Sequence, residues 1–473
     1  MQRHCVDLCV IGAGSGGLSV AAAATQMGAS TVLIEKGRMG GDCLNYGCVP
    51  SKSLLASAHA AMEARAASRF GVDCGEPKID DARVYAHIRS VIGAIAPNDS
   101  QERFEGLGAT VIRAPARFIG RGEVEAGDHR IMARRFVIAT GSSPMVPPIP
   151  GLAGIPFETN ETIFERRNLP RHLIVIGGGP IGMEMAQAHR GLGTEVTVLQ
   201  KGKILPKDDP EMTAILRDLL AGDGIRIIED ADVLGVEKTA SGAAAKVRAN
   251  GKEERIEGTD VLVSAGRKPT IDDLGLEAAG IDYTPKGVTV DARLRTTNKK
   301  VFAIGDAAGP YQFTHMAGYH AGIVIRNALL RLPAKVDYRA VPWVTYTAPE
   351  LAHVGLSEQD ARAQGHAIRV LRWSFHENDR AQAEGATDGL VKVIATPRGR
   401  VLGATVLGAH AGELIQTWSL AIKEKLKVSA IAGMIAPYPT LGEVNKRAAA
   451  SFYAAAIFSP MVRRLVRFLS HFG

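Results

Sequence analysis

The stretch Val6-Asp7-Leu8-Cys9-Val10-Ile11-Gly12-Ala13-Gly14-Ser15-Gly16-Gly17 decides the fold of the first part of the chain. Its apolar half predicts a short strand, and its glycines predict a tight G-x-G-x-x-G turn before an alanine-rich helix over 18–27. A second apolar run, 30–34, ends at Glu35. A strand, a glycine turn, a helix and a strand that ends in an acid form the order of a dinucleotide-binding βαβ unit.

Each position in this unit has a physical role. Gly12 permits the tight turn, Gly14 lets a pyrophosphate approach the backbone, and Gly17 lets the helix pack on the strand. Glu35 can accept a hydrogen bond from a ribose hydroxyl. The glycine pattern alone is weak, but the βαβ context and the acid together predict dinucleotide binding.

Two cysteines follow in Gly40-Gly41-Asp42-Cys43-Leu44-Asn45-Tyr46-Gly47-Cys48-Val49-Pro50-Ser51-Lys52. About one turn of helix brings two cysteines at this spacing close enough for a disulfide, and a helix start favours a thiolate. The glycines before them allow the backbone to approach a ligand. A redox pair, a structural disulfide and half of a zinc site are the alternatives. No Cys/His cluster at ligand spacing lies nearby, so no metal site is expected.

The pattern GGxCxNxGCxPSK resembles the active-site segment of the class I flavoprotein disulfide reductases, which include dihydrolipoamide dehydrogenase, glutathione reductase and mercuric reductase. The resemblance implies that Cys48 faces the flavin as the charge-transfer thiol and that Cys43 exchanges with substrate. It also places Gly41 at the FAD and Lys52 beside the flavin ring.

Length and composition agree with a large α/β enzyme. The chain has 473 residues, 46% of them hydrophobic, and a formal net charge of +7 with the basic residues scattered except at the C-terminus. Acidic cofactors account for that excess as well as nucleic acid does, and no nucleic-acid motif is present, so no nucleic-acid partner is expected.

All five cysteines lie in the first 74 residues, which argues against a secreted disulfide framework. Cys5, Cys9 and Cys74 are interpreted as structural, with those in the first strand behaving as small buried hydrophobes. No signal region and no run of 18 apolar residues are found, so the sequence predicts a cytoplasmic protein without a membrane-spanning helix.

A second copy of the nucleotide-binding device begins at 173–176 and continues through Gly177, Gly179 and Gly182 to the apolar run 195–199. Two such units predict two dinucleotides. The resemblance implies FAD on the first unit and a nicotinamide cofactor on the second, with Glu184 near the nicotinamide and near Lys52. The alternative for Glu184 is an ordinary exposed helix acid.

Where an NAD-type unit has an acid, this chain has Gln200, followed by Lys201 and Lys203. An acid would repel a 2′-phosphate, whereas an amide beside ammonium groups would not, so the sequence favours NADPH. The alternative is that the two lysines are only solvated in a surface loop and that Gln200 bonds an unphosphorylated ribose.

Further segments resemble the family's FAD contacts. Thr140 and Gly141 lie in an Ala-Thr-Gly segment, Gly266 lies at the return to the FAD domain, and Gly305 precedes Asp306, which the resemblance assigns to the ribityl chain of FAD. For His315 a packed or solvent-facing position is favoured over one at the flavin.

The predicted fold class is α/β, with two Rossmann-like dinucleotide-binding domains and a C-terminal α+β dimerisation domain. The resemblance implies a homodimer whose active site is completed by the partner subunit. The predicted boundaries are 1–150 and 271–338 for the FAD-binding domain, 151–270 for the NAD(P)-binding domain, 339–458 for the dimerisation domain and 459–473 for a basic amphipathic tail.

The sequence departs from the resemblance at Tyr438, which stands where dihydrolipoamide dehydrogenase and glutathione reductase have a histidine held by the residue at Glu443. A phenol with a pKa near 10 is a poor general base at neutral pH, whereas an imidazole near 6.5 is a good one. Mercuric reductases have tyrosine there, but they also carry a C-terminal cysteine pair, and no cysteine follows Cys74. Soluble transhydrogenases share the Tyr-Pro-Thr motif but have lost one redox cysteine.

The tail combines arginines with apolar residues at helical spacing. Packing on its own dimer is favoured over contact with an anionic membrane surface.

The leading functional prediction is an FAD-dependent, NAD(P)H-linked dithiol/disulfide oxidoreductase that resembles dihydrolipoamide dehydrogenase. The resemblance implies that electrons pass between NAD(P)H, FAD, the Cys43–Cys48 disulfide and a small-molecule or protein-bound disulfide. A mercuric reductase-like enzyme, or one that reduces a quinone or other acceptor, is the alternative. A non-enzymatic redox sensor is disfavoured because Cys43, Cys48, Lys52, Glu184 and Glu443 are all retained.

Overall fold

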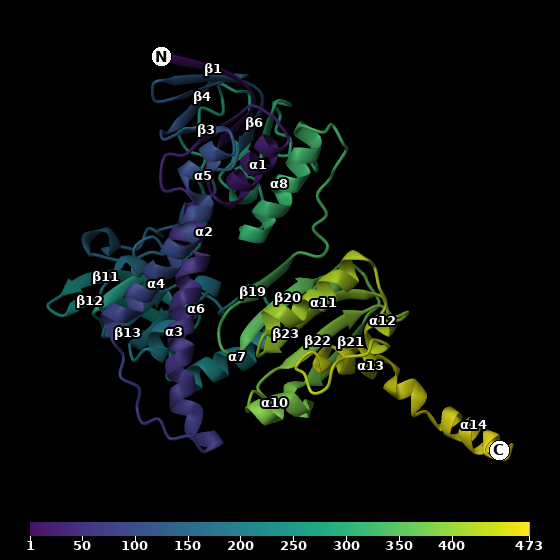
Figure 1. The fold of residues 1–473 in the computed structure, drawn as a ribbon. Coiled ribbons are helices and arrows are strands. Elements are labelled where there is room, and N and C mark those ends of the chain that lie inside the picture. Colours follow the sequence, from purple (N-terminus) through teal and green to yellow (C-terminus); the bar gives the residue numbers. More distant parts are fainter. Residues whose placement is uncertain (473) are drawn as a thin grey trace. The chain divides into compact units, whose positions relative to one another are not determined.

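The computed structural model describes residues 1–472, and the contacts of the chain divide it into two compact units. The first unit comprises Met1–Gly177, Ala188–Lys201 and Ala231–Val336, and the second comprises Gly178–Gln187, Gly202–Asp230 and Asp337–Gly473. Figure 1 labels their helices and strands. Among residues 1–472, no helix is both long and apolar enough to cross a bilayer.

The first unit is built on a seven-stranded sheet with the order β3-β2-β1-β6-β5-β4, in which β18 also pairs with β6. Strands β3, β2, β1, β6 and β18 run parallel, and β4 and β5 form an antiparallel extension. The strands are β1 (Gln2–Ile11), β2 (Thr31–Ile34), β3 (Ala109–Ile112), β4 (Ala116–Gly120), β5 (Glu123–Ala126), β6 (His129–Ile138) and β18 (Val301–Ala303).

The register of this sheet brings four strand ends to one edge. Ile11 at the end of β1 pairs with Ile34 of β2 and with Ile138 of β6, and Ile138 pairs with Ala303 of β18. The residues that follow these ends, including Gly12 and Glu35, therefore lie together at the carboxyl edge, where ligands bind in parallel α/β sheets.

Helices α1 (Ser15–Gln26) and α8 (Thr314–Ala328) pack against each other on this sheet. The segment 81–106 forms α4 (Asp81–Ile95), a 3-10 turn (Ala96–Asp99) and α5 (Gln101–Gly106). Pro97 and the extended Ser100, whose hydroxyl accepts from the Arg103 amide, account for the break between α4 and α5. The preceding helices are α2 (Gly41–Asn45) and α3 (Cys48–Ala66).

The second nucleotide-binding repeat has the parallel strands β9, β8 and β14. Ile176 at the end of β8 pairs with Leu199 of β9 and Val263 of β14, so Gly177, Gln200 and Ser264 follow at one edge. The elements are β8 (His172–Ile176), α6 (Pro180–Gly191), β9 (Glu195–Leu199), β10 (Arg226–Ile228), β11 (Asp232–Thr239), β12 (Gly242–Ala249), β13 (Lys252–Gly258) and β14 (Asp260–Val263), with the small strands β7 (Ser142–Pro144), β15 (Arg267–Pro269), β16 (Tyr283–Thr284) and β17 (Gly287–Val288).

The second unit is built on an antiparallel sheet with the order β19-β20-β23-β22-β21. Its core includes the fully buried Trp418, whose indole N–H donates to Asn445 at 2.7 Å and so ties α11 to α13. The elements are α7 (Pro210–Gly222), β19 (Pro342–Thr345), β20 (Glu350–Gly355), α9 (Glu358–Ala363), β21 (Arg369–Ser374), α10 (Asp379–Glu384), β22 (Leu390–Ala395), β23 (Val401–Gly408), α11 (Ala411–Lys423), α12 (Val428–Ala432), α13 (Glu443–Ile457) and α14 (Pro460–Leu469).

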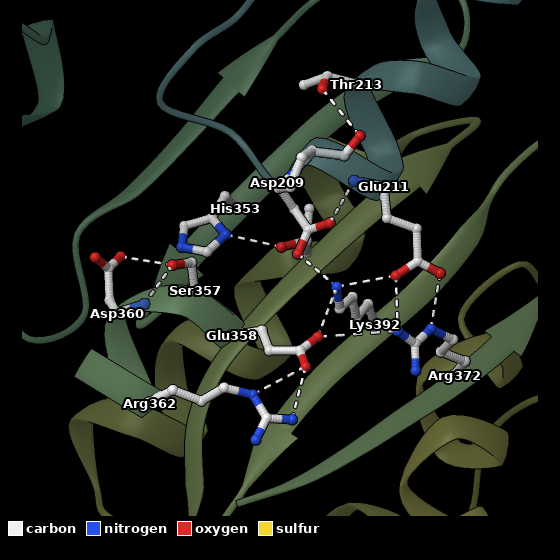
Figure 2. Close-up of polar contacts among 12 residues, drawn as sticks. Asp209, Glu211, Thr213, His353, Ser357, Glu358, Asp360, Arg362, Arg372 and Lys392 are labelled. Atoms are coloured by element: carbon white, nitrogen blue, oxygen red, sulfur yellow. Dashed lines mark hydrogen bonds and ion pairs between the residues drawn. The ribbon is translucent and has the colours of Figure 1, made fainter. Parts of the chain in front are cut away.

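A buried ammonium group fastens α7 to this sheet (Figure 2). Lys392 of β22 is almost fully buried, and its Nζ lies 2.8 Å from Asp209, 2.9 Å from Glu211 and 3.1 Å from Glu358. Asp209 also caps α7, and Arg372 of β21 donates from Nε and Nη2 to the two carboxylate oxygens of Glu211, each at 2.8 Å. Buried charges need such partners, so the cluster fixes the start of α7 on the sheet.

Candidate functional site

The two cysteines predicted to form the redox pair lie on consecutive helices of the first unit. Cys43 is on α2, and Cys48 is the first residue of the 19-residue helix α3. Neither cysteine is in a disulfide, so both carry reduced thiols. Gly41 has a φ of +61°, and a Cβ on it would lie 2.6 Å from Gly14 Cα. A glycine here therefore allows this loop to run against the nucleotide-binding turn.

The pair is electrostatically asymmetric. The hydrogen bond to Cys48, burial and repulsion from a Cys48 thiolate together raise the pKa of Cys43 well above its ordinary value. Cys48 Sγ lies 3.4 Å from the Thr314 hydroxyl and sits at a helix N-terminus, where the macrodipole favours negative charge. The helix N-terminus and the Thr314 hydroxyl thus favour negative charge at Cys48, while the raised pKa of Cys43 favours its protonated thiol.

Lys52 is half-buried one helical turn after Cys48 on α3, so the two side chains share a face of that helix. The helix therefore brings the predicted flavin-side lysine and thiol to the same surface.

The first glycine turn is sterically determined. Gly12 has a φ of +104°, and a Cβ on it would lie 2.4 Å from Ala139 O; a Cβ on Gly17 would lie 1.8 Å from Gly12 O. The carboxylate of Glu35 accepts from the Ala13 amide and the Gly37 amide, each at 2.6 Å. Glu35 is thus fixed at the end of β2 as the dinucleotide fingerprint requires.

Asp306 lies in a polar chain at the same sheet edge. The Ser142 hydroxyl donates to Asp306 Oδ2 at 2.6 Å, Arg267 Nε donates to Ser142 at 2.7 Å, and Arg267 also pairs with Asp42 at 3.1 Å. Burial raises the pKa of Asp306 above its ordinary value. A carboxyl in this setting is stabilised by further hydroxyl donors such as those of a ribityl chain.

Thr140 supplies a direct test of fit to FAD. Its hydroxyl is buried and has no hydrogen-bond partner within residues 1–472. A Cβ on the neighbouring Gly141, at a φ of +66°, would meet open space. An orphaned hydroxyl beside an open backbone position fits a polar ligand at this edge, so the residues present suit the dinucleotide that the sequence predicts.

His320, rather than His315, contributes to this region. His320 is buried on α8, its Nδ1 accepts from the Gly305 amide at 3.1 Å, and burial lowers its pKa to about 4. It is therefore neutral at physiological pH and holds the turn that carries Asp306. His315 is exposed and stacks on Phe313 with ring centroids 5.2 Å apart, consistent with the expected packed or solvent-facing position.

The second glycine turn repeats the first. Gly177 has a φ of +117°, and a Cβ on it would lie 2.5 Å from Ser264 O, whereas a Cβ on Gly179 would meet open space. Gly182 is buried on α6, and Gly266 has a φ of +125°. The open position at Gly179 is where a pyrophosphate approaches the backbone in this fold.

The side chains that follow β9 differ in their exposure and in whether their charge is compensated by an ion pair. Gln200 is partly exposed and Lys201 is exposed at the end of that strand. In the second unit, Lys203 Nζ lies 2.7 Å from Asp230 and 3.3 Å from Glu229. Lys201 therefore presents its charge to solvent, whereas the charge of Lys203 is compensated.

Glu184 is buried on α6, with 4% of its surface exposed, and it accepts from the Tyr346 amide at 3.0 Å. The alternative of an ordinary exposed helix acid is therefore wrong. The following turn of α6 places Gln187 in a pair of hydrogen bonds with the backbone of Ala348, each 2.7 Å long. These contacts fix the orientation of Glu184 on the helix.

Tyr438 precedes α13 and has a partner that the sequence did not reveal. Its hydroxyl donates to Asp379 Oδ2 at 2.8 Å, and this hydrogen bond raises the pKa of Tyr438. Asn378 next to Asp379 donates to Thr440 O at 3.1 Å, so α10 holds the tyrosine loop at two points. Glu443 is the first residue of α13, and the bond of the Tyr438 hydroxyl goes to Asp379 instead.

The remaining cysteines lie outside this site. Cys9 is fully buried in β1, as expected. Cys5 is exposed at the outer end of the same strand, so the expectation of burial is wrong for it, and Cys74 is exposed as well.

Comparison with known proteins now identifies the family. The pyridine nucleotide-disulphide oxidoreductase signature matches residues 6–321, and the signature of the family's dimerisation domain matches residues 341–449. The chain belongs to the pyridine nucleotide-disulphide oxidoreductase family. The predicted fold class and the prediction of a flavoprotein oxidoreductase are confirmed, as is the resemblance itself.

Relatives in this family carry two different names. The chain is 34% identical over 449 residues to a mercuric reductase of Bacillus cereus, covering 94% of this chain and 71% of that protein. It is 34% identical over 461 residues to one of Streptomyces lividans, covering 96% and 97%. It is also 35% identical over 465 residues to a dihydrolipoyl dehydrogenase of Thermus scotoductus, covering 95% and 98%.

Solved structures agree with the fold. The Cu(II) complex of the HOCl-induced flavoprotein disulfide reductase RclA from Escherichia coli has a TM-score of 0.84 at 27% identity, covering 93% of this chain and 99% of that one. LpdA from Mycobacterium tuberculosis has a TM-score of 0.85 at 27% identity, covering 95% and 99%. The family uses FAD and NAD(P), and these similarities leave the substrate open.

Proposed function

We propose that this protein is a dihydrolipoamide dehydrogenase-like dithiol/disulfide oxidoreductase in which Cys43 and Cys48 exchange electrons with a small-molecule or protein-bound disulfide. The observation that carries the proposal is the asymmetric pair, with a proton-holding Cys43 beside a Cys48 at a helix N-terminus. Such a pair has one thiol for substrate exchange and one thiolate for the cofactor side.

The residues that would hold the cofactors lie at the two glycine turns. FAD would be held by Gly12, Gly14, Gly17, Glu35, Gly41, Thr140, Gly141, Gly305 and Asp306, and NAD(P)H by Gly177, Gly179, Gly182, Gln200, Lys201 and Gly266. When bound, these cofactors supply the electrons that open the Cys43–Cys48 disulfide. Lys52 and Glu184 are proposed to lie near their reacting rings.

The exchange with substrate follows from the two thiols. Cys43 first gives its proton to an acid–base group, and its Sγ then attacks one sulfur of the substrate disulfide as a thiolate. A mixed disulfide forms, and the first substrate thiolate leaves and takes up that proton. The Cys48 thiolate then attacks Cys43 Sγ, the second substrate thiolate leaves and takes a proton from solvent, and the Cys43–Cys48 disulfide re-forms. Two electrons pass from the pair to the substrate, and the reverse sequence oxidises a dithiol.

Tyr438 and Asp379 are proposed to move the proton in this exchange. Because the phenolic proton is bonded to Asp379, the Tyr438 oxygen presents its lone pairs outward. It can take a proton from a substrate thiol while passing its own to Asp379, a relay that needs no free phenolate. Glu443 is proposed to support this loop from the start of α13.

The remaining parts of the proposal rest on the sequence. The chain carries the family's dimerisation domain, and we propose a homodimer in which the partner subunit supplies Tyr438 to the cysteines. The proposed domain boundaries are those of the sequence prediction: 1–150, 151–270, 271–338, 339–458 and 459–473. The cysteine usage supports action in the cytoplasm, and Gln200 with Lys201 supports NADPH.

A second candidate is reduction of a metal ion or another non-disulfide acceptor. It is favoured by Tyr438 in place of histidine and by relatives named mercuric reductase. The lack of any cysteine after Cys74 in the sequence disfavours it, because no second thiol pair can hand a metal inward.

Serine substitutions test the proposal. Cys43→Ser and Cys48→Ser, each in FAD-loaded protein, are expected to abolish NAD(P)H-dependent reduction of lipoamide, whereas the exposed Cys74→Ser should leave it unchanged. Lipoamide turnover that survives Cys43→Ser would show that the pair is not the route to substrate.

A further inference from the structure

The last helix of the chain has two chemically opposed faces. α14 spans Pro460–Leu469, beyond the end of α13 (Figure 1). Its N-terminus is capped, because the Ser459 hydroxyl accepts a hydrogen bond from the Val462 amide at 3.3 Å and Pro460 occupies the first turn. The helix is therefore specified by local sequence and not by packing alone.

At 100° per residue, the side chains of α14 separate cleanly. Arg463, Arg464 and Arg467 fall on one side of the helix. The opposite side carries only apolar residues, namely Met461, Val462, Leu465, Val466, Phe468 and Leu469, and the next turn adds Phe472 on the same side.

Within residues 1–472, no other part of the chain buries this apolar side. No residue of α14 is buried, and the exposed fractions are 75% for Met461, 52% for Leu465 and 60% for Phe468. A continuous stripe of large apolar side chains left in water is unfavourable, and on a folded protein it marks an interaction surface.

The charge of the helix distinguishes between two candidate partners for its apolar side, a second copy of α14 and a membrane surface. The segment 459–472 contains three arginines and His471 but no acidic residue. Two copies of α14 packed through their apolar sides would leave all six arginines facing outward, with no compensating carboxylate from the helix itself. A bilayer that contains anionic phospholipids offers the complementary chemistry, with apolar chains for one side and phosphates for the other.

We propose that α14 lies in the plane of an anionic membrane surface, with Leu465, Phe468 and their apolar neighbours inserted below the headgroups and the three arginines at the phosphates. With 10 residues, the helix is too short to span a bilayer, so it would bind peripherally. The sequence alone favoured packing on the dimer, which would cover the apolar side only, whereas an anionic membrane surface complements both the apolar side and the arginines.

Vesicle flotation of the full-length, FAD-loaded protein tests this proposal. The protein is expected to float with phosphatidylcholine vesicles that contain 30% phosphatidylglycerol and to stay behind with pure phosphatidylcholine. Leu465→Glu with Phe468→Glu should abolish flotation, and Arg463→Gln, Arg464→Gln and Arg467→Gln together should weaken it roughly 100-fold, at about 1 kcal/mol per arginine.

A matched triple variant controls for net charge. Arg398→Gln, Lys425→Gln and Lys427→Gln remove three exposed cations elsewhere and should leave flotation unchanged. Lack of flotation with anionic vesicles, equal flotation with neutral ones, or an equal loss in the control triple would overturn the proposal. Loss of the dimer in Leu465→Glu with Phe468→Glu, without vesicle binding by the unmodified protein, would assign α14 to a second copy of the chain.

Discussion

The Tyr438 hydroxyl donates a hydrogen bond of 2.8 Å to Asp379, a residue 59 positions earlier in the chain. The bond raises the pKa of Tyr438, so a free phenolate is not the base at neutral pH. It also commits the only phenolic proton to a carboxylate and leaves the oxygen as an acceptor. This chain thus joins a tyrosine to an aspartate, at the position where the resemblance to dihydrolipoamide dehydrogenase predicts a histidine held by a glutamate.

Asp379→Asn tests this pair. The amide cannot take up the relayed proton, so dithiol oxidation should fall about 100-fold near neutral pH, at the low end of the usual range for proton-transfer groups. Reduction of the FAD by NAD(P)H, followed by flavin absorbance, should be unaffected. Asp388→Asn, at an exposed position of the same unit, is the control. An unchanged pH profile in Asp379→Asn would rule out the relay.

Tyr438→His should restore a direct base. An imidazole with a pKa near 6.5 accepts a proton at neutral pH, so dithiol oxidation should become faster there and should gain a pH-dependent limb near pH 6–7. The measurement is the initial rate of dihydrolipoamide oxidation between pH 5.5 and 9. A flat or slower profile would mean that Tyr438 does not occupy the base position.

Thr140→Val separates cofactor binding from folding. The buried Thr140 hydroxyl lacks a partner in the described chain, so its removal should stabilise the FAD-free protein by about 1 kcal/mol. The same change should weaken FAD binding, because the hydroxyl would no longer meet the ligand. Thermal unfolding with and without FAD measures both effects, and equal shifts in the two states would contradict the assignment of Thr140.

Gln200→Glu tests the nicotinamide preference. A carboxylate after β9 would repel a 2′-phosphate and accept from a free ribose hydroxyl. The KM for NADPH should therefore rise and that for NADH should fall, whereas the unmodified protein should have the lower KM for NADPH. Identical KM ratios before and after the substitution would remove Gln200 from the specificity site.

Lys392→Met tests the buried cluster. It removes the ammonium group that bonds Asp209, Glu211 and Glu358, and the uncompensated carboxylates should destabilise the protein by about 3 kcal/mol. Lys423→Met removes a half-exposed ion pair with Asp337 and should lower the free energy of unfolding by less than about 1 kcal/mol. Denaturant unfolding at pH 7 compares the two variants, and equal losses would contradict a special role for Lys392.

The same cluster makes the stability of the folded protein depend on pH. The hydrogen bond from Arg372, followed by that from Lys392, lowers the pKa of Glu211 from 4.5 to about 2. A carboxyl whose pKa is lower in the folded than in the unfolded state stabilises the folded state. This stabilisation is complete at a pH above the unfolded-state pKa and is lost as the pH falls through the folded-state pKa. Stability of the unmodified protein should therefore decline between about pH 4.5 and pH 2, and Lys392→Met should flatten that decline.

Local patterns made much of the first unit predictable. The strand of β1, the turn at Gly12, the close packing at Gly17 and the acid at Glu35 all follow from spacing within one βαβ unit, and the structure places them as expected. Such features depend on neighbours in sequence, which is why a single chain is enough to predict them.

Contacts between distant segments were not predictable. Asp379 and Tyr438 are 59 residues apart, and the buried Glu184 accepts from the amide of Tyr346, 162 residues later. The break between α4 and α5 depends on Pro97, which is visible in the sequence, together with Ser100, whose capping role shows only in the backbone. Cys5 is exposed because β1 extends beyond the buried part of its sheet.

The most direct measurement is anaerobic oxidation of dihydrolipoamide by the FAD-loaded protein, with NAD⁺ and NADP⁺ in parallel and Hg(II) reduction as the competing assay. A dithiol/disulfide oxidoreductase should reduce the nicotinamide at the expense of the dithiol, with turnover abolished in Cys43→Ser. Absence of dithiol turnover, together with NAD(P)H-dependent reduction of Hg(II), would contradict the proposed function and favour the metal-reducing alternative.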